Sequence, residues 1–240
     1  MQSSWRGTVG VIKPTMRPGS LEEFIRLMPE GVGVIPTFLN IQEGTSSEFE
    51  SVMQVVEERV AELARLGVDL IHPEGAPPFM LQGFDGERAL TDRWESTYRI
   101  PIVTAGQTQV EALQALGIER MVGVTYFVGE LNDTFSRYFE GAGFQVLAME
   151  GISVPFQDVG RLASTEVYAL AHKAFLQHPE AQGIYMLGSG WRVLDIIEPL
   201  EQDLGVPVVH AVPARVWSIQ KRLHLRQPVH GFGQLLDRMP

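Results

Sequence analysis

The sequence contains no cysteine among its 240 residues. This absence excludes disulfide bonds, metal sites built on thiolates and catalysis by a cysteine nucleophile. Basic residues are also scarce, since 19 Lys and Arg stand against 29 Asp and Glu and give a formal net charge of −10. We therefore expect no nucleic-acid partner, because binding nucleic acid requires a basic surface that neutralises phosphates.

Long apolar runs are missing as well. No stretch approaches the roughly 18 apolar residues that span a membrane, and the first residues, 1–6, lack the apolar core of a signal peptide. We therefore expect a cytoplasmic protein with no membrane partner. Glycine-rich nucleotide fingerprints and a His-Glu-x-x-His motif are absent, and the six histidines are scattered. We accordingly expect no metal site.

What is present is a regular alternation of short β-branched runs with longer amphipathic stretches. The runs predict strands at 8–12, 31–37, 68–72, 100–104, 121–125, 144–149, 183–187 and 206–210. The amphipathic stretches predict helices at 46–66, 107–116, 130–141, 164–177, 192–203 and 213–224. This alternation is typical of a mainly parallel sheet covered by helices on both faces.

The two halves of the chain are similar to each other. For example, Val9-Gly10-Val11 matches Val122-Gly123-Val124, and each of these runs precedes a turn and a helix. We predict an α/β fold of two pseudo-symmetric halves, each a four-stranded, mainly parallel sheet flanked by helices. Residues 1–105 and 212–240 form the first half and residues 106–211 the second, with approximate boundaries.

This duplication predicts where a ligand binds. Parallel sheets bind ligands beyond the carboxyl ends of their strands. Two related halves that face each other bring the loops after residues 12, 72, 124 and 187 around one cleft. We expect the functional site in this cleft.

Three residues in these loops are candidates for chemistry. Ser189 lies between two glycines and either donates a hydrogen bond to a carboxylate or enolate, acts as a nucleophile beside a base, or is only a turn residue. His210 ends the last predicted strand of the same half and can accept a proton from a hydroxyl. Glu74 follows a strand of the first half and is either a base or a loop carboxylate.

Other residues of the same loops are candidates for substrate binding. Lys13 follows the first strand and either pairs with an anionic substrate or forms a surface ion pair. Gly75, Ala76 and Gly190 are small, so backbone N–H groups can approach a carboxylate or an enediolate there, unless they serve close packing alone. Arg192, near a helix start, either contacts a ligand carboxylate or pairs with an acid of its own helix.

Four segments carry a resemblance to a known family: 124–132, 183–190, 204–209 and 213–217. In this order they are similar to the aspartate/glutamate racemase superfamily, and within it to the branch of maleate isomerase and arylmalonate decarboxylase. The resemblance covers nearly the whole chain. It implies a cofactor-free enzyme that forms carbanions beside a carboxylate, and the family tendency to associate implies a homo-oligomer.

The resemblance also implies site residues. Racemases and isomerases of the family use two cysteines, one from each half, and the decarboxylase keeps only the second. These positions match Gly75 and Ser189, so both thiols are absent here. Thr125 begins the family's Thr-x-Tyr turn, whose tyrosine falls on Phe127 or, with a shift of one residue, on Tyr126.

One further implied contact is Asn40. It follows the second predicted strand and resembles the flexible loop that covers the family's cleft.

These observations predict a lyase or isomerase that acts on a small carboxylate through an enolate-like intermediate. Decarboxylation is preferred, because it needs no base to remove a proton and depends on donors that stabilise the enediolate. It is therefore the family reaction least affected by the loss of a thiol. The alternatives are a hydrolase that uses Ser189 and His210, and a non-catalytic carboxylate-binding protein on the same fold.

Overall fold

Two parallel sheets form the framework of the molecule, whose computed structural model describes residues 4–240. The first sheet has the order β2–β1–β3, with β1 (Gly7–Lys13), β2 (Val32–Phe38) and β3 (Leu70–Pro73). The second has the order β5–β4–β6–β7, with β4 (Arg120–Thr125), β5 (Gln145–Gly151), β6 (Gly183–Met186) and β7 (Val208–His210). The strand pairs in both sheets are parallel. The predicted fold class is therefore confirmed.

Residues 1–3 lie outside the described residues. Two predictions include these residues: the first half, which was expected to begin at residue 1, and the segment 1–6, which was expected to contain no signal peptide. The boundaries given above for the two halves stay a prediction.

The first sheet differs from the sequence prediction at its edge. Instead of a strand at 100–104, Ile102 forms a single bridge to Ile71. Pro101 has no N–H to donate, and the N–H of Ile102 donates to the carboxylate of Glu95 at 2.7 Å. The ladder therefore stops after one bridge, and the prediction of four full strands is wrong for this sheet and right for the second.

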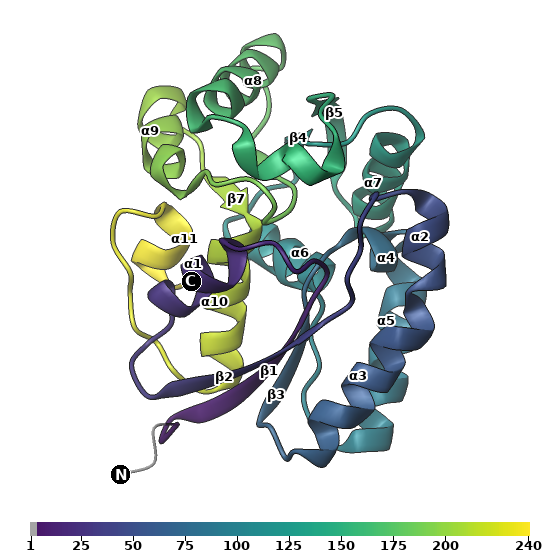
Figure 1. The fold of residues 1–240 in the computed structure, drawn as a ribbon. Helices are drawn as coiled ribbons and strands as arrows, with labels where there is room; N and C mark the ends of the chain where they lie inside the picture. The colour runs from purple at the N-terminus through teal and green to yellow at the C-terminus, as the bar shows by residue number, and fades with distance from the viewer. Residues whose placement is uncertain (1–3) are drawn as a thin grey trace.

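Helices cover both sheets. They are α1 (Ser20–Leu27), α2 (Ser46–Ser51), α3 (Met53–Arg65), α4 (Pro77–Met80), α5 (Gly83–Tyr98), α6 (Ala105–Ala115), α7 (Glu130–Gly141), α8 (Ser164–Gln177), α9 (Leu194–Leu204), α10 (Ala211–Arg222) and α11 (Gln234–Arg238), with a 3₁₀ helix η1 (Phe156–Arg161). In Figure 1, α3 and α5 lie beside one face of the first sheet, and α1 and α10 lie on its other side. Within residues 4–240, no helix is long and apolar enough to cross a membrane.

Two predicted helices, 130–141 and 164–177, have the predicted bounds. The long helix expected at 46–66 is divided at Val52 into α2 and α3. Helix α1 was not expected. Its first turn is stabilised by the Glu22 carboxylate, which accepts the N–H of Gly19 at 2.6 Å. This short helix matters for the site, because two of its residues, Ser20 and Phe24, contact Arg215 of α10.

A buried carboxyl group joins α5, α6 and α7. Glu87 on α5 is fully buried and accepts the hydroxyl of Thr104 at 2.6 Å and the hydroxyl of Tyr138. Gly106 leaves room for this group, because a Cβ there would lie 2.7 Å from the Tyr138 oxygen. Burial raises the pKa of Glu87 to about 7, although the two hydroxyl donors oppose this shift.

We expect Glu87 to make the fold less stable as the pH rises. The folded protein keeps the proton on Glu87 up to about pH 7, whereas the unfolded chain releases it near its ordinary value of 4.5. Between these values the stability falls, by about 3 kcal/mol in total. The Glu87→Gln variant lacks this titration, so urea unfolding should show its stability relative to wild type rising by about that amount from pH 5 to pH 8. A difference that is equal at both pH values would contradict the assignment.

Candidate functional site

A cavity of about 50 Å³ lies where the carboxyl ends of the two sheets face each other. Its walls come from the segments that follow β1, β3, β4 and β6, together with η1 and the start of α10. This is the cleft predicted from the sequence. Seven of the residues proposed from the sequence line it: Lys13, Glu74, Gly75, Ala76, Tyr126, Ser189 and Gly190. The functional roles of these residues stay proposals.

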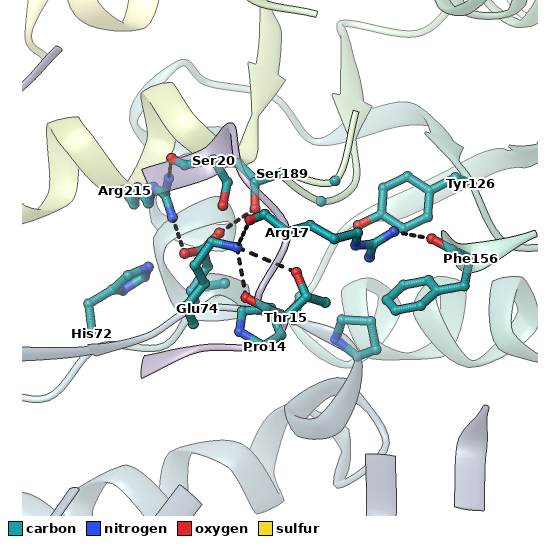
Figure 2. A pocket seen from close by; sticks show the side chains of 18 of the residues that line it. Pro14, Thr15, Arg17, Ser20, His72, Glu74, Tyr126, Phe156, Ser189 and Arg215 are labelled. Atoms are coloured by element: carbon teal, nitrogen blue, oxygen red, sulfur yellow. Dashed lines mark hydrogen bonds and ion pairs between the residues drawn. The ribbon is translucent and has the colours of Figure 1, made fainter. Parts of the chain in front are cut away.

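A buried carboxylate lies at the centre of the cavity wall. Glu74, directly after β3, forms an ion pair with Arg215 of α10, with 2.8 Å between Oε2 and Nη1. Its other oxygen accepts the hydroxyl of Ser189, which follows β6, at 2.5 Å. Figure 2 shows the three side chains pointing toward one another from different parts of the fold. The cluster therefore ties the first half of the chain to the loop after β6.

Arg215 is held in place by α1. Its Nη2 donates to the carbonyl oxygen of Ser20 at 2.5 Å, and its guanidinium carbon lies 4.7 Å from the centroid of the Phe24 ring. Arg215 and Glu74 are 2% and 3% exposed, so water screens their attraction little. Burial opposes the charge of Glu74, but Arg215, the Ser189 hydroxyl and Lys13 together hold the pKa of Glu74 below its ordinary value.

Lys13 contributes charge to the cavity and also shapes its wall. Its ammonium group donates to the carbonyl oxygens of Thr15 and Arg17, at 2.8 and 2.5 Å. These bonds fold the segment after β1 over the cavity. Burial lowers the pKa of Lys13, while the nearby charge of Glu74 opposes this shift.

Arg17 crosses the cavity toward η1. Its Nη1 donates to the carbonyl oxygen of Phe156, and its guanidinium carbon lies 4.3 Å from the centroid of the Phe156 ring. Figure 2 shows the guanidinium beside the Tyr126 ring. Arg17 therefore connects the segment after β1 with the second half of the chain.

Tyr126, rather than Phe127, lines the cavity. Burial raises the pKa of its hydroxyl to about 12, while the charge of Arg17 and the backbone N–H of Gly190 oppose this shift. A side chain at Gly188, whose φ is +82°, would collide with this hydroxyl. The absence of side chains at Gly188 and Gly190 therefore leaves room for the Tyr126 ring.

Gly75 stands at the first of the two thiol positions implied by the resemblance. Its φ is +94°, and a Cβ there would lie 3.0 Å from the Cβ of Pro14. Any side chain at this position would be strained and would press on Pro14. The local backbone therefore favours glycine.

The cavity carries an excess of positive charge. Three cationic side chains, Lys13, Arg17 and Arg215, line it with a single carboxylate, Glu74, which gives a formal charge of +2. His72 also lines it and is neutral, because burial lowers its pKa to about 4. Within residues 4–240, no group of three or more His, Asp or Glu side chains is placed to hold a metal ion. The arrangement suits a small anion of charge −2.

The proposed pairing of Ser189 with His210 is wrong. His210 caps α10, because its Nδ1 accepts the N–H of Val212 at 3.4 Å. Its Nε2 donates to the carbonyl oxygen of Gly188 at 2.9 Å. Burial lowers the pKa of His210 to about 3. Both ring nitrogens are engaged, and the Ser189 hydroxyl donates to Glu74 instead.

Two residues proposed to bind substrate lie elsewhere. Thr125 is fully buried, where its hydroxyl donates to Asn132 at 2.6 Å and accepts the N–H of Phe127 at 3.0 Å. It shapes the turn that presents Tyr126. Asn40 is exposed, and its side-chain oxygen accepts the amide of Gln42 at 2.5 Å. Neither residue is among those that line the cavity.

The sequence interpretation missed the two arginines of the cavity. Arg215 is the fifth residue of α10, which begins at the carboxyl end of β7. A cation in the first turns of a helix is electrostatically unusual, and this signal was applied to Arg192. Arg192 is exposed and lies against Gly19, outside the cavity lining. The same signal, applied to α10, would have found Arg215.

Comparison with known proteins agrees with the resemblance seen in the sequence. The model of a family described as arylmalonate decarboxylase matches residues 9–236. An arylmalonate decarboxylase from Bordetella bronchiseptica is 24% identical over 243 residues, which cover 99% of each chain.

Solved structures show the same fold. A maleate isomerase from Pseudomonas putida S16 has a TM-score of 0.90 at 19% identity and covers 98% of this chain and 99% of its own. A serine mutant of the Nocardia farcinica maleate cis-trans isomerase, with a covalently bound succinylcysteine intermediate, has a TM-score of 0.89 at 21% identity and covers 97% of this chain and 98% of its own. The predicted similarity to the maleate isomerase and arylmalonate decarboxylase branch is confirmed.

Proposed function

Because the chain belongs to the arylmalonate decarboxylase family, we propose that it is a cofactor-independent lyase that decarboxylates a small dicarboxylate through an enediolate. The observation that carries this proposal is the cavity of formal charge +2 with the Ser189 hydroxyl in its wall. A malonate-type dianion neutralises this charge. When CO₂ departs, the negative charge moves onto the enediolate and stays beside the same cations.

The size of the cavity argues for a substrate without an aryl ring. Its volume is about 50 Å³, whereas an apolar cavity of about 150 Å³ holds benzene. A malonate dianion is itself about as large as benzene and would occupy the whole cavity and its opening, so an aryl substituent would find no room beside the two carboxylates. In this respect the substrate differs from the arylmalonate named for the family.

The missing thiols favour decarboxylation over isomerisation. The Nocardia farcinica isomerase holds its intermediate as a succinylcysteine, and this chain has no cysteine that can form such a bond. Decarboxylation breaks a carbon–carbon bond without covalent attachment to the protein. The electron pair of that bond remains on the α-carbon, and CO₂ leaves.

Ser189 is placed to supply the proton that completes the reaction. With substrate bound, the hydroxyl turns away from Glu74, to which it donates in the free protein, and its proton moves to the α-carbon. The resulting alkoxide recovers a proton from water as the product leaves. A serine hydroxyl is a weak acid, but an enediolate is a much stronger base than an alkoxide. Arg215 and Lys13 lie beside Glu74 and offset the charge that forms on Ser189.

A hydrolase is the second candidate, and the hydrogen bond between Ser189 and Glu74 is the observation in its favour. In that reaction Glu74 would take the proton from Ser189, which would attack an ester. The ion pair with Arg215 holds the pKa of Glu74 below its ordinary value, which makes it a weak base. Decarboxylation is therefore the better supported reaction.

A substrate panel in D₂O tests the proposal. It contains malonate, methylmalonate, hydroxymalonate, phenylmalonate, maleate and a carboxylate ester. We expect CO₂ release from a small malonate and one solvent deuterium on the α-carbon of the product. Ester hydrolysis alone would favour the hydrolase. Tight binding of one compound without turnover of any would show a carboxylate-binding protein instead.

Arg17 should contribute to recognition of the dianion. We expect Arg17→Gln to lower kcat/KM by about 10–100-fold, the scale of one lost hydrogen bond to a charged group. The matched control is Arg161→Gln in η1, because Arg161 is 85% exposed and pairs with Asp158. Steady-state kinetics should show the control within twofold of wild type. Equal effects of both variants would show that only the overall charge matters.

A further inference from the structure

Two buried polar atoms in the cavity wall have no partner in the part of the chain that the structure describes. Apart from atoms of the Glu74–Arg215 ion pair, they are Nε2 of His72 and Nε2 of Gln109. Both side chains are fully buried, and both residues line the cavity. A buried donor or acceptor without a partner costs about 1–3 kcal/mol. Neither atom has a part in the decarboxylation described above.

The free atom of His72 is a hydrogen-bond acceptor. The Nδ1 atom lies 2.7 Å from the carbonyl oxygen of Val103, which can only accept. The proton of the neutral ring is therefore on Nδ1, and Nε2 presents a lone pair.

The free atom of Gln109 is a donor. Its Oε1 accepts the hydroxyl of Tyr185 at 2.9 Å, so the NH₂ group is the part of the amide that has no partner among the described residues. Gln109 lies one turn after Ala105 on α6, and Ala105 also lines the cavity. Val103, which holds His72, lies two residues before Ala105. The segment 103–109 therefore contacts His72 and contains Gln109, and both residues line the cavity.

We propose that His72 and Gln109 form a subsite for a hydroxyl group, so that the substrate is a small dicarboxylate with a hydroxyl substituent. The hydroxyl donates to Nε2 of His72 and accepts from the amide of Gln109. A methyl group would leave both atoms unpaired, and a carbonyl group would leave His72 unpaired. An ammonium group cannot accept from Gln109 and would add a cation to a cavity that is already positive.

This inference rests on one part of the proposed function, which is that the ligand is a dicarboxylate. It does not depend on decarboxylation. Calorimetric binding is therefore the first test, with hydroxymalonate and methylmalonate as a pair that differs by a hydroxyl in place of a methyl. We expect the wild type to bind hydroxymalonate about 10–100-fold more tightly.

Two variants remove the proposed partners separately. In His72→Asn, the amide nitrogen keeps the bond to Val103 while the acceptor Nε2 is lost. The double variant Gln109→Leu/Tyr185→Phe removes the amide without leaving the Tyr185 hydroxyl unpaired, and Tyr185→Phe alone is its control. Each test variant should lower the preference for hydroxymalonate at least fivefold, with binding of methylmalonate within twofold of wild type. Tyr185→Phe should keep the preference.

The outcomes separate this inference from the proposed function. A preference for hydroxymalonate that both test variants reduce, without CO₂ release, would keep the hydroxyl subsite and overturn the decarboxylase. Equal binding of the two ligands, or a preference that both test variants leave intact, would overturn the subsite even if CO₂ is released. Failure of both ligands to bind would overturn the subsite as well.

Discussion

Ser189→Ala is expected to lower kcat/KM for decarboxylation by about 10²–10⁴-fold, the usual contribution of a positioned general acid. The enediolate would then lack its proton donor. Glu74 is ionised by its pairing with Arg215, and Lys13 donates to the backbone of its own loop. Initial rates of CO₂ release, with deuterium incorporation measured in D₂O, check the prediction.

The chain offers a matched control for this variant. Ser218 on α10 also donates to a glutamate that is paired with an arginine: its hydroxyl lies 3.0 Å from Glu111, which pairs with Arg222. This second cluster lies outside the cavity lining. Ser218→Ala should therefore keep kcat/KM within about twofold of wild type.

A Ser189→Cys variant distinguishes the two enzyme reactions. A thiol has a pKa near 8.5 and protonates a carbanion more readily than a hydroxyl does. The variant should therefore decarboxylate at least as fast as wild type. If Ser189→Ala and Ser189→Cys both turn over the true substrate at the wild-type rate, Ser189 is only a turn residue.

Much of the fold was predictable because the spacing of apolar residues in a segment matches the helix or strand that the segment forms. The helices at 130–141 and 164–177 show apolar residues at a spacing of 3–4, and the structure has them with the same bounds. The pattern failed where a single residue changes the backbone. At the edge of the first sheet, Pro101 prevents a fourth strand from forming, although the residues around it are β-branched.

The site was predictable only in part, because its main contacts join distant segments. The rule that ligands bind at the carboxyl ends of strands placed Ser189 and Glu74 correctly in the cavity wall. Their direct contact spans 115 residues of sequence, so no local pattern indicates it. His210 is nearer in sequence to Ser189, but its ring is needed to cap α10. Proximity in sequence was the wrong guide to the partner of the hydroxyl.

The ion pair between Glu74 and Arg215 gives the largest expected effect on stability. We expect Arg215→Met to lower the free energy of unfolding by about 3–5 kcal/mol at pH 7, because it leaves the buried charge of Glu74 without its main partner. The double variant Glu74→Gln/Arg215→Met removes both charges and should recover most of this loss. Urea unfolding followed by circular dichroism measures all three proteins.

The pH dependence of this loss identifies its cause. In the wild type the pKa of Glu74 is held below its ordinary value of 4.5. The pair therefore stabilises the fold above that value, and this contribution is lost as the pH falls through the folded-state pKa. The deficit of Arg215→Met should accordingly shrink toward pH 4, where Glu74 of the variant can take up a proton.

Arg93→Met is the control, because Arg93 is 59% exposed and its pair with Glu57 is 3.3 Å long, so its loss should cost at most about 1 kcal/mol. A deficit in Arg215→Met that is no larger than that of Arg93→Met, or that persists unchanged at pH 4, would mean that the packing of Arg215 on Phe24 stabilises the fold and that the charge of Glu74 does not.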